Sequence, residues 1–278
     1  MDYDGLNYVV DYGENLMLYF RGCTARERLT NVANATGKLL DLANINYNMV
    51  GDEGCCGSVL LRTGFPEEAK KQMEKNITNL NLENEKIVVS CAGCYKTLKK
   101  DYKNILGVEL DVIHISQLLK QLINEGKISP NKGSLKVTYH DPCHLGRHSD
   151  EFDAPREVIT NFSDLIEMEN VKEDAKCCGS GGGVKSAFPD LANSIAINRG
   201  KEAEATGAEI LVTSCPFCEL NLEENSSLKI MDLSEFVLKH LKKEETNHLE
   251  KKKLEKLEKE DIDQLENKKS KNLKKEEG

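Results

Sequence analysis

Ten cysteines are the residues best suited to chemistry in this 278-residue chain, because a thiolate is both a nucleophile and a soft metal ligand. Five lie in the first part of the sequence and five in the second, with corresponding members 120, 122, 122, 124 and 124 residues apart. The surrounding motifs also repeat, since CCGS occurs twice and VVSCAGC resembles VTSCPFC. This agreement predicts an internal duplication. The two sets are Cys23, Cys55, Cys56, Cys91 and Cys94, and Cys143, Cys177, Cys178, Cys215 and Cys218.

Each set contains two adjacent cysteines. A disulfide between them is disfavoured, because neighbouring Cα atoms are about 3.8 Å apart whereas unstrained bridges need roughly 4.4 to 6.8 Å. A pair of small buried residues is an alternative. Glycines beside the pairs, Gly54, Gly57, Gly179 and Gly181, favour instead a sharp turn whose N–H groups face a cofactor. We therefore expect both adjacent thiols to reach one site.

Three kinds of cysteine chemistry can be compared. A CxxC motif at the start of a helix is typical of thioredoxin-like dithiols, but that function leaves eight cysteines unexplained. Structural zinc closes with four ligands, usually at compact spacing, so a zinc-stabilised scaffold remains a weaker alternative. Thiolates are the usual protein ligands of iron–sulfur clusters, and five thiols per half favour that cofactor.

The composition narrows the choice of partners and compartment. A net charge of −9 disfavours nucleic acid, because phosphate binding needs a dense basic face. No run of about 18 apolar residues occurs, and the acidic start MDYDGLNYVVDYGEN is unlike a signal peptide. We expect no direct membrane span and a reducing, cytoplasmic location, where thiols serve metals or redox chemistry.

Strand and helix patterns alternate in both halves. Apolar runs predict short buried strands at 16–20, 86–90, 135–139 and 209–214. Polar–apolar periodicity predicts helices at 31–45, 67–80, 95–102, 191–205 and 219–225. Alternation of this kind implies parallel, βαβ-type sheets. The expected fold class is α/β, with two homologous cysteine-rich halves related by internal duplication.

The predicted domain boundaries follow the repeat. An N-terminal segment covers 1–12, and the two cysteine-rich domains cover 13–130 and 131–241. Residues 242–278 are rich in Lys and Glu, which predicts a charged helical or disordered tail. A thin leucine stripe in this tail leaves a partner-binding coiled coil as an alternative.

The duplicated order of a cysteine, a CCG motif and a CxxC motif resembles the CCG-domain family, together with YHDPCHLGRH at 139–148. This family includes the B subunit of heterodisulfide reductase and the catalytic part of its D subunit. The resemblance covers residues 16–241 and implies two noncubane 4Fe-4S clusters, one on each set of five cysteines. It also implies reduction of the coenzyme M–coenzyme B disulfide to two thiols, in the metabolism of methanogenesis.

The same resemblance implies partners and leaves alternatives. Electrons are expected from a ferredoxin-like iron–sulfur subunit and an upstream flavin or membrane subunit. One alternative is a thiol:fumarate reductase subunit that runs the reaction backwards. Another is an electron-transfer subunit of a 2-hydroxy-acid or glycerol-3-phosphate dehydrogenase complex.

Residues near the cysteine motifs are candidates for supporting roles. His140 and His144 are predicted proton donors to a departing thiolate, although Pro142 disfavours a helix that would align them. The acidic groups of the family's thiol substrates imply a local basic pocket. The predicted substrate-binding residues are Arg62, Arg147 and Lys185.

Overall fold

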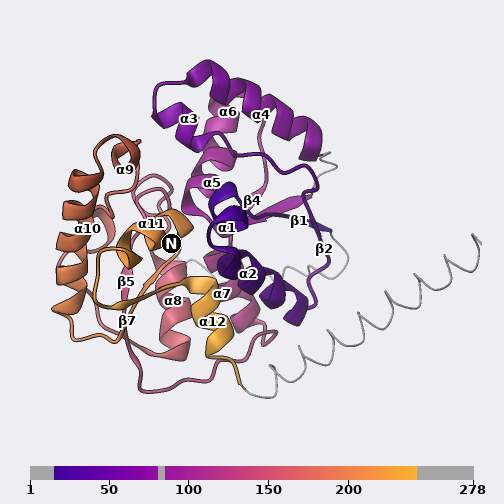
Figure 1. The fold of residues 1–278 in the computed structure, drawn as a ribbon. Helices are drawn as coiled ribbons and strands as arrows, with labels where there is room; N and C mark the ends of the chain where they lie inside the picture. The colour runs from indigo at the N-terminus through magenta and orange to yellow at the C-terminus, as the bar shows by residue number, and fades with distance from the viewer. Residues whose placement is uncertain (1–15, 81–84, 243–278) are drawn as a thin grey trace, which may run out of the picture.

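Two four-stranded sheets form the centre of the molecule in the computed structural model, which describes residues 16–80 and 85–242 (Figure 1). The strand order is β2-β1-β3-β4 in one sheet and β6-β5-β7-β8 in the other, and all of these pairings are parallel. The predicted α/β architecture of two similar halves is confirmed. The predicted segment 1–12 and all but the first residue of the tail lie outside the described residues.

The first half follows the predicted alternation of strands and helices. Its elements in chain order are β1 (Met17–Phe20), α1 (Cys23–Glu27), α2 (Thr30–Leu42), β2 (Tyr47–Met49), α3 (Ser58–Arg62), α4 (Pro66–Leu80), β3 (Lys86–Val89), α5 (Ala92–Lys96), the π-helix η1 (Thr97–Asp101), α6 (Tyr102–Leu106), β4 (Val112–His114) and α7 (Ile115–Asn124).

The second half repeats this order with local differences. Its elements are β5 (Lys136–His140), α8 (Asp153–Phe162), β6 (Asp164–Leu165), the 3-10 helix η2 (Lys172–Asp174), α9 (Val184–Ala187), α10 (Pro189–Glu204), β7 (Ile210–Thr213), α11 (Pro216–Glu223), β8 (Lys229–Asp232) and α12 (Leu233–Lys239). None of the helices in the described ranges is long and apolar enough to cross a membrane.

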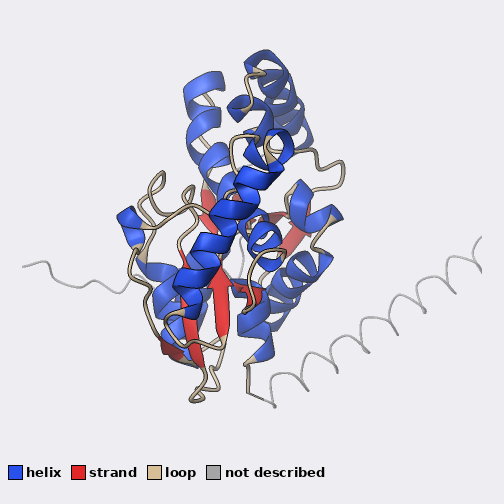
Figure 2. Cartoon of the chain, turned by 60° about the vertical axis from the view of Figure 1, so that its left-hand side comes forward, coloured by secondary structure: helices blue, strands red, loops and turns tan. Residues whose placement is uncertain are grey.

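The central strands β1, β3, β5 and β7 are largely buried on both faces, because helices cover both sides of each sheet (Figure 2). In β1, Met17 and Tyr19 face one hydrophobic core while Leu18 and Phe20 face another. This alternation follows from the period of two in an extended chain. Continuous apolar runs were therefore the correct signal for these strands.

One hydrophobic core joins the two halves. It contains side chains from α2 and α7 of the first half and from α8 and α12 of the second, which lie together in Figure 1. Phe162 and Phe236 meet edge to face within it, with ring centroids 6.2 Å apart. The Thr36 hydroxyl also donates a hydrogen bond to Ser234 Oγ across the halves, at 3.0 Å. The two sheets are consequently held in one fixed relation.

The strand order determines where a ligand can bind. In the first sheet β1 and β3 are central neighbours, and their connections leave toward opposite edges. Parallel sheets bind ligands at the carboxyl ends of strands, at such a switch point. Phe20 pairs with Val89 at the ends of β1 and β3, and His140 pairs with Thr213 at the ends of β5 and β7. Each switch point is followed directly by cysteine-bearing loops.

Candidate metal centre

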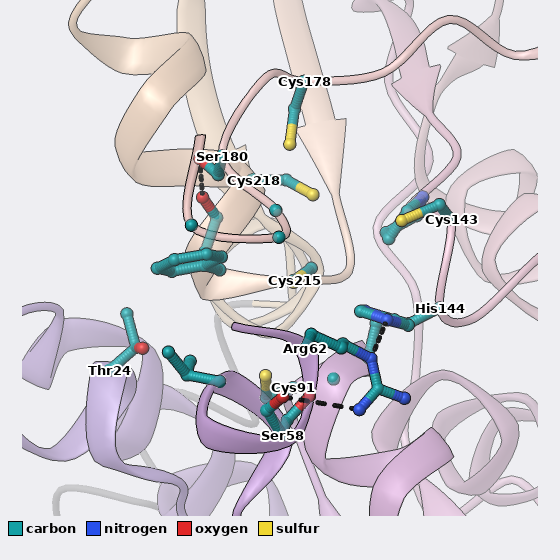
Figure 3. Close-up of a pocket in the computed structure, with 18 of the residues that line it drawn as sticks. Thr24, Ser58, Arg62, Cys91, Cys143, His144, Cys178, Ser180, Cys215 and Cys218 are labelled. Atoms are coloured by element: carbon teal, nitrogen blue, oxygen red, sulfur yellow. Dashed lines mark hydrogen bonds between the residues drawn. The ribbon is translucent and has the colours of Figure 1, made fainter. Parts of the chain in front are cut away.

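All ten cysteines line a single cavity of about 450 Å³ between the two halves (Figure 3). In Figure 3 the thiols of Cys178, Cys215 and Cys218 lie on one side of this cavity and Cys91 lies on the other. None of the ten is in a disulfide. The fold therefore brings together two sets of thiols that are about 120 residues apart in the chain.

Three elements deliver the first set. Cys23 begins α1 after β1, while Cys91 is the N-cap of α5 after β3 and Cys94 lies in the first turn of that helix. Cys55 and Cys56 lie in the loop before α3. The Cys23 and Cys55 sulfur atoms are 3.8 Å apart. The adjacent pair thus contributes to the same site as the other three cysteines.

The second set is delivered in the same way. Cys143 lies in the turn after β5, Cys215 is the N-cap of α11 after β7, and Cys218 follows in that helix. Cys177 and Cys178 lie in the loop that leads to α9. The placement of Cys143 and Cys215 therefore follows from the central strands that they succeed.

Left-handed glycines shape the loops after the cysteine pairs. Gly57 has φ +91° and Gly179 has φ +86°, conformations that other residues adopt at a cost. A Cβ on Gly179 would lie 2.4 Å from the Ala192 carbonyl oxygen, whereas Gly181 has open space. Gly54 and Gly181 have no positive φ among the described residues. Gly57 and Gly179 therefore supply the turn that the sequence led us to expect beside each pair.

Buried polar side chains fix the backbone of both pairs. Asn76 Nδ2 donates to the Cys55 carbonyl at 2.7 Å, and Asn221 Nδ2 donates to the Cys178 carbonyl at 2.6 Å. The buried Glu53 carboxylate accepts from the backbone N–H of Gly22 at 2.8 Å, which connects the Cys55 loop to the Cys23 loop. The sequence did not identify these residues, because a lone Asn or Glu has no distinctive motif.

The thiols of each set shift one another's pKa values through hydrogen bonds. Hydrogen bonds from Cys55 and Cys94 lower the pKa of Cys56, and hydrogen bonds from Cys177 and Cys218 lower that of Cys178. The neighbouring Cys55 shifts in the other direction. The hydrogen bond with Cys23 lowers the pKa of Cys55, but the hydrogen bond between Cys55 and Cys56, together with burial, raises that pKa to about 11 overall. Close thiolates repel one another, so ionising all five requires cations between them.

This donor set fits iron. Ten unpaired thiols in two groups of five, mostly buried and mutually close, match the thiolate ligation of iron–sulfur clusters. The two groups also meet, since the hydrogen bond between Cys91 and Cys215 raises the pKa of Cys91 and contributes to lowering that of Cys215. The residues that would hold the two clusters are therefore adjacent across the junction of the halves.

His144 lies at the cavity and is bonded to a residue of the other half. Arg62 Nε donates to His144 Nε2 at 3.0 Å, and Arg62 also forms an ion pair with Asp101 at 2.8 Å. Burial, and then the charge of Arg62, lower the pKa of His144 to about 4. His144 is consequently a neutral imidazole near pH 7, with its proton on Nδ1.

The other predicted residues have different surroundings. His140 ends β5 and has a ring nitrogen within 4.8 Å of the Cys178 and Cys218 sulfurs. Arg147 donates to the Ala175 carbonyl at 2.5 Å, and Lys185 forms an ion pair with Glu224. Neither Arg147 nor Lys185 is among the residues that line the cavity, whereas Arg62 is. The expected basic pocket thus has one arginine among its described lining residues.

Comparison with known proteins gives one family and related reductase subunits. Residues 17–99 and 137–223 match CCG, the cysteine-rich domain. The chain is 43% identical over 225 residues to the D subunit of dihydromethanophenazine:CoB–CoM heterodisulfide reductase from Methanosarcina mazei, covering 77% of this chain and 55% of the relative. It is 32% identical over 246 residues to the B subunit of fumarate reductase (CoM/CoB) from Methanothermobacter marburgensis, covering 85% of this chain and 49% of the relative. The chain therefore spans about half the length of these relatives.

A solved structure gives only a remote likeness. Glutamate racemase RacE1 of Bacillus anthracis is 13% identical, with a TM-score of 0.38, over 86% of this chain and 83% of the racemase. A score this low carries no argument about fold or function.

Proposed function

This chain belongs to the CCG cysteine-rich domain family, and from that premise we propose that it is the disulfide-reducing iron–sulfur subunit of a heterodisulfide reductase type enzyme. The observation that carries the proposal is the convergence of ten free cysteines, five from each half, on one cavity. The substrate we propose is the mixed disulfide of coenzymes M and B. The 43% identity to the D subunit of a heterodisulfide reductase supports this choice.

The reaction consumes two electrons and two protons for each disulfide and releases two thiols. Two noncubane 4Fe-4S clusters, one on each set of five cysteines, would supply the one-electron steps and the iron to which sulfur binds. The electrons would come from a partner of the ferredoxin-like class, itself supplied by a flavin or membrane subunit. The chain's own task is to hold both sites beside one bound disulfide.

Apolar and small residues suit the cavity to a compact organic disulfide. Its lining includes Val59, Phe188 and Phe217 as well as a glycine-rich loop at 181–183. The volume of about 450 Å³ is in the ordinary range for small-molecule sites, although bound clusters would fill part of it. Apolar walls exclude water, which strengthens the attraction between Arg62 and an anionic substrate group.

Proton supply is assigned to His144, which lines the cavity, and to its neighbour His148. His144 carries its proton on Nδ1, because Nε2 accepts from Arg62. We propose that this Nδ1–H is directed at a departing thiolate and is replenished from solvent through His148, whose ring centroid lies 5.3 Å from that of His144. The reverse reaction, oxidation of two thiols, would use the same residues, in keeping with the likeness to the B subunit of a fumarate reductase.

The test combines metal content with turnover. The full chain is reconstituted without oxygen and assayed with the coenzyme M–coenzyme B disulfide and a reduced viologen dye as the electron donor. We expect about eight iron and eight sulfide per chain, as two four-iron clusters require. Cys55→Ser and Cys178→Ser should each retain about half of the iron and lose turnover, whereas Ser186→Ala, in the cavity lining, should retain both.

Other outcomes contradict the proposal in different ways. About two zinc per chain without sulfide would indicate a structural metal site instead. Eight iron without disulfide turnover would favour an electron-transfer subunit. Retained turnover in either cysteine variant would refute the need for both clusters.

A further inference from the structure

The duplication provides an internal reference for each position of the site. Tyr19 of β1 corresponds to Tyr139 of β5, so Phe20 corresponds to His140. Helices α4 and α10 correspond from Pro66 and Pro189 onward, and each buried position of α4 is also buried in α10. In this alignment Asn76 of the first half corresponds to Arg199 of the second. Two neighbouring positions behind the cysteines therefore differ in chemistry between the halves.

In the second half these two positions form a buried polar pair. His140 is 1% exposed and Arg199 is fully buried. Arg199 Nε donates to His140 Nδ1 at 3.2 Å, while its Nη1 donates to the Asn170 carbonyl at 2.9 Å and pairs with Glu202 at 2.9 Å. The guanidinium is thus held in place on its far side and directs one N–H at the imidazole.

This contact determines the tautomer of His140. An arginine N–H can only donate and stays protonated, so Nδ1 of His140 must be the acceptor. The proton of the neutral ring is then on Nε2. A ring nitrogen of His140 lies within 4.8 Å of the Cys178 and Cys218 sulfurs, and Nε2 is the nitrogen that Arg199 leaves free. Hydrogen bonds from Cys177 and Cys218 lower the pKa of Cys178 most, and the bond from His140 lowers it further.

The first half has no such donor at the two corresponding positions. Phe20 packs in the same core as Cys56 and Cys94 and offers only carbon. The Asn76 amide is used by the Cys55 carbonyl, at 2.7 Å, and by Tyr102 Oη, at 2.9 Å. The two sites therefore offer the same five cysteine ligands, but the side chains around those ligands differ.

We propose that His140, positioned by Arg199, donates a fixed Nε2–H hydrogen bond to the cysteine sulfurs of the second-half cluster and gives that cluster the higher reduction potential of the two. A hydrogen bond to a ligand sulfur stabilises the more negative, reduced state of a cluster. The inference rests on the proposed function, because it requires iron in both sites. It assigns an order, since the second-half cluster is the first to accept an electron.

The test is a redox titration of the iron-loaded full chain, followed by electron paramagnetic resonance. The wild type should show two one-electron midpoints. His140→Phe, which imports the first-half residue, should lower the upper midpoint by the equivalent of about tenfold in the redox equilibrium, or about 59 mV, and leave the lower one unmoved. His140→Gln retains an N–H donor and should keep the upper midpoint close to its wild-type value.

A second variant separates the loss of the His140 hydrogen bond from the effects of misfolding. His140→Phe leaves a buried Arg199 N–H without its acceptor, whereas the double variant His140→Phe, Arg199→Asn installs the pair that the first half already contains. It should show the same single shift, with iron content unchanged from the wild type. Equal midpoints in the wild type, a shift of both midpoints, or a ¹⁴N coupling that shows direct iron ligation by His140 would overturn the inference.

Iron content distinguishes a failure of the inference about His140 from a failure of the proposed function. Wild-type protein without iron would refute the proposed function, and the inference with it. Two clusters whose midpoints ignore His140 would refute the inference alone.

Discussion

Arg62 links the two halves at the cavity through its side chain. Its guanidinium contacts His144 of the second half and Asp101 of the first, and it is the one Lys, Arg, Asp or Glu among the described lining residues. Burial opposes ionisation of Asp101, but hydrogen bonds from Lys96 and Arg62 outweigh it and lower the pKa of that carboxyl. Arg62 is therefore a fixed cation whose position depends on both halves.

Replacing Arg62 should weaken substrate binding. Arg62→Gln removes the charge that an anionic disulfide would meet, so KM for the disulfide should rise at least about tenfold, the equivalent of one charge-assisted hydrogen bond. Arg147→Gln is the matched control, because Arg147 donates to the backbone carbonyls of Glu173 and Ala175 away from the cavity lining. Steady-state kinetics gives KM for the disulfide in both variants. Equal KM values would contradict a role for Arg62 in substrate binding.

Among the elements, the loop between η2 and α9 shows how backbone conformation positions a thiol. Its glycines do not act alike, because Gly179 has a positive φ and packs against the Ala192 carbonyl, while Gly181 has neither constraint. The α10 helix thereby supports the Cys177–Cys178 turn directly. The sequence showed four glycines in this loop without indicating which of them the fold requires.

The two glycines should therefore respond differently to substitution. Gly179→Ala should cost about 1 to 2 kcal/mol for the left-handed conformation alone, and the clash with α10 should displace the cysteine pair. We expect iron content to fall to about half, while Gly181→Ala stays at the wild-type value. Iron analysis and urea unfolding test this, and equal iron in both variants would show that the turn is not needed.

The start of α7 provides a pH-sensitive element. His114 is fully buried and caps this helix, with Nδ1 accepting from the Ser116 N–H at 3.2 Å. Burial lowers its pKa to about 4 from an ordinary 6.5. Because the unfolded chain takes up this proton first as the pH falls, stability from His114 is complete above about pH 6.5 and is lost toward pH 4.

Removing this titration should flatten the pH dependence of stability. His114→Asn keeps an N-cap acceptor but does not titrate in this range. Between pH 7 and pH 4, its free energy of unfolding should therefore fall by up to roughly 3 kcal/mol less than that of the wild type, the value of a pKa shift of this size. Urea unfolding of both proteins at several pH values gives the difference, in which the common carboxylate contribution cancels. Parallel stability curves would refute the assignment.

At the scale of the whole molecule, the halves share a hydrophobic core, and we therefore expect them to unfold as one cooperative unit. Phe236 of α12 is fully buried and packs against Phe162 of α8, in the same cluster as side chains of α2 and α7. The cavity lies between the halves, so its geometry depends on this core. Loss of packing here should loosen both cysteine sets together.

A core substitution tests this coupling. Phe236→Ala should cost about 3 to 5 kcal/mol and still give a single unfolding transition. Hydrogen exchange should accelerate in both halves. Phe188→Ala is the control, because this side chain is 63% exposed and should change stability by less than about 0.5 kcal/mol. Two separate transitions, or faster exchange in the second half alone, would contradict a shared core.

The sequence by itself determined the duplication, the two sets of five thiols, the four central strands and several of the helices. These features can be read from the chain itself. A continuous apolar run predicts the bounds of β1 and β7 to within one residue, and the sequence directly gives the spacing of the cysteines. The four edge strands β2, β4, β6 and β8 were not predicted, because segments of only two to four residues carry too little pattern to distinguish a strand.

Only the tertiary structure decided how the two sets meet. That Cys91 lies beside Cys215, that Arg62 contacts His144 and that Arg199 supports His140 are relations between residues 59 to 124 positions apart. Such contacts depend on how two sheets pack through a common core and on which helix covers which face. No local propensity encodes that arrangement, so the sequence predicted the ligands and the structure placed them around one cavity.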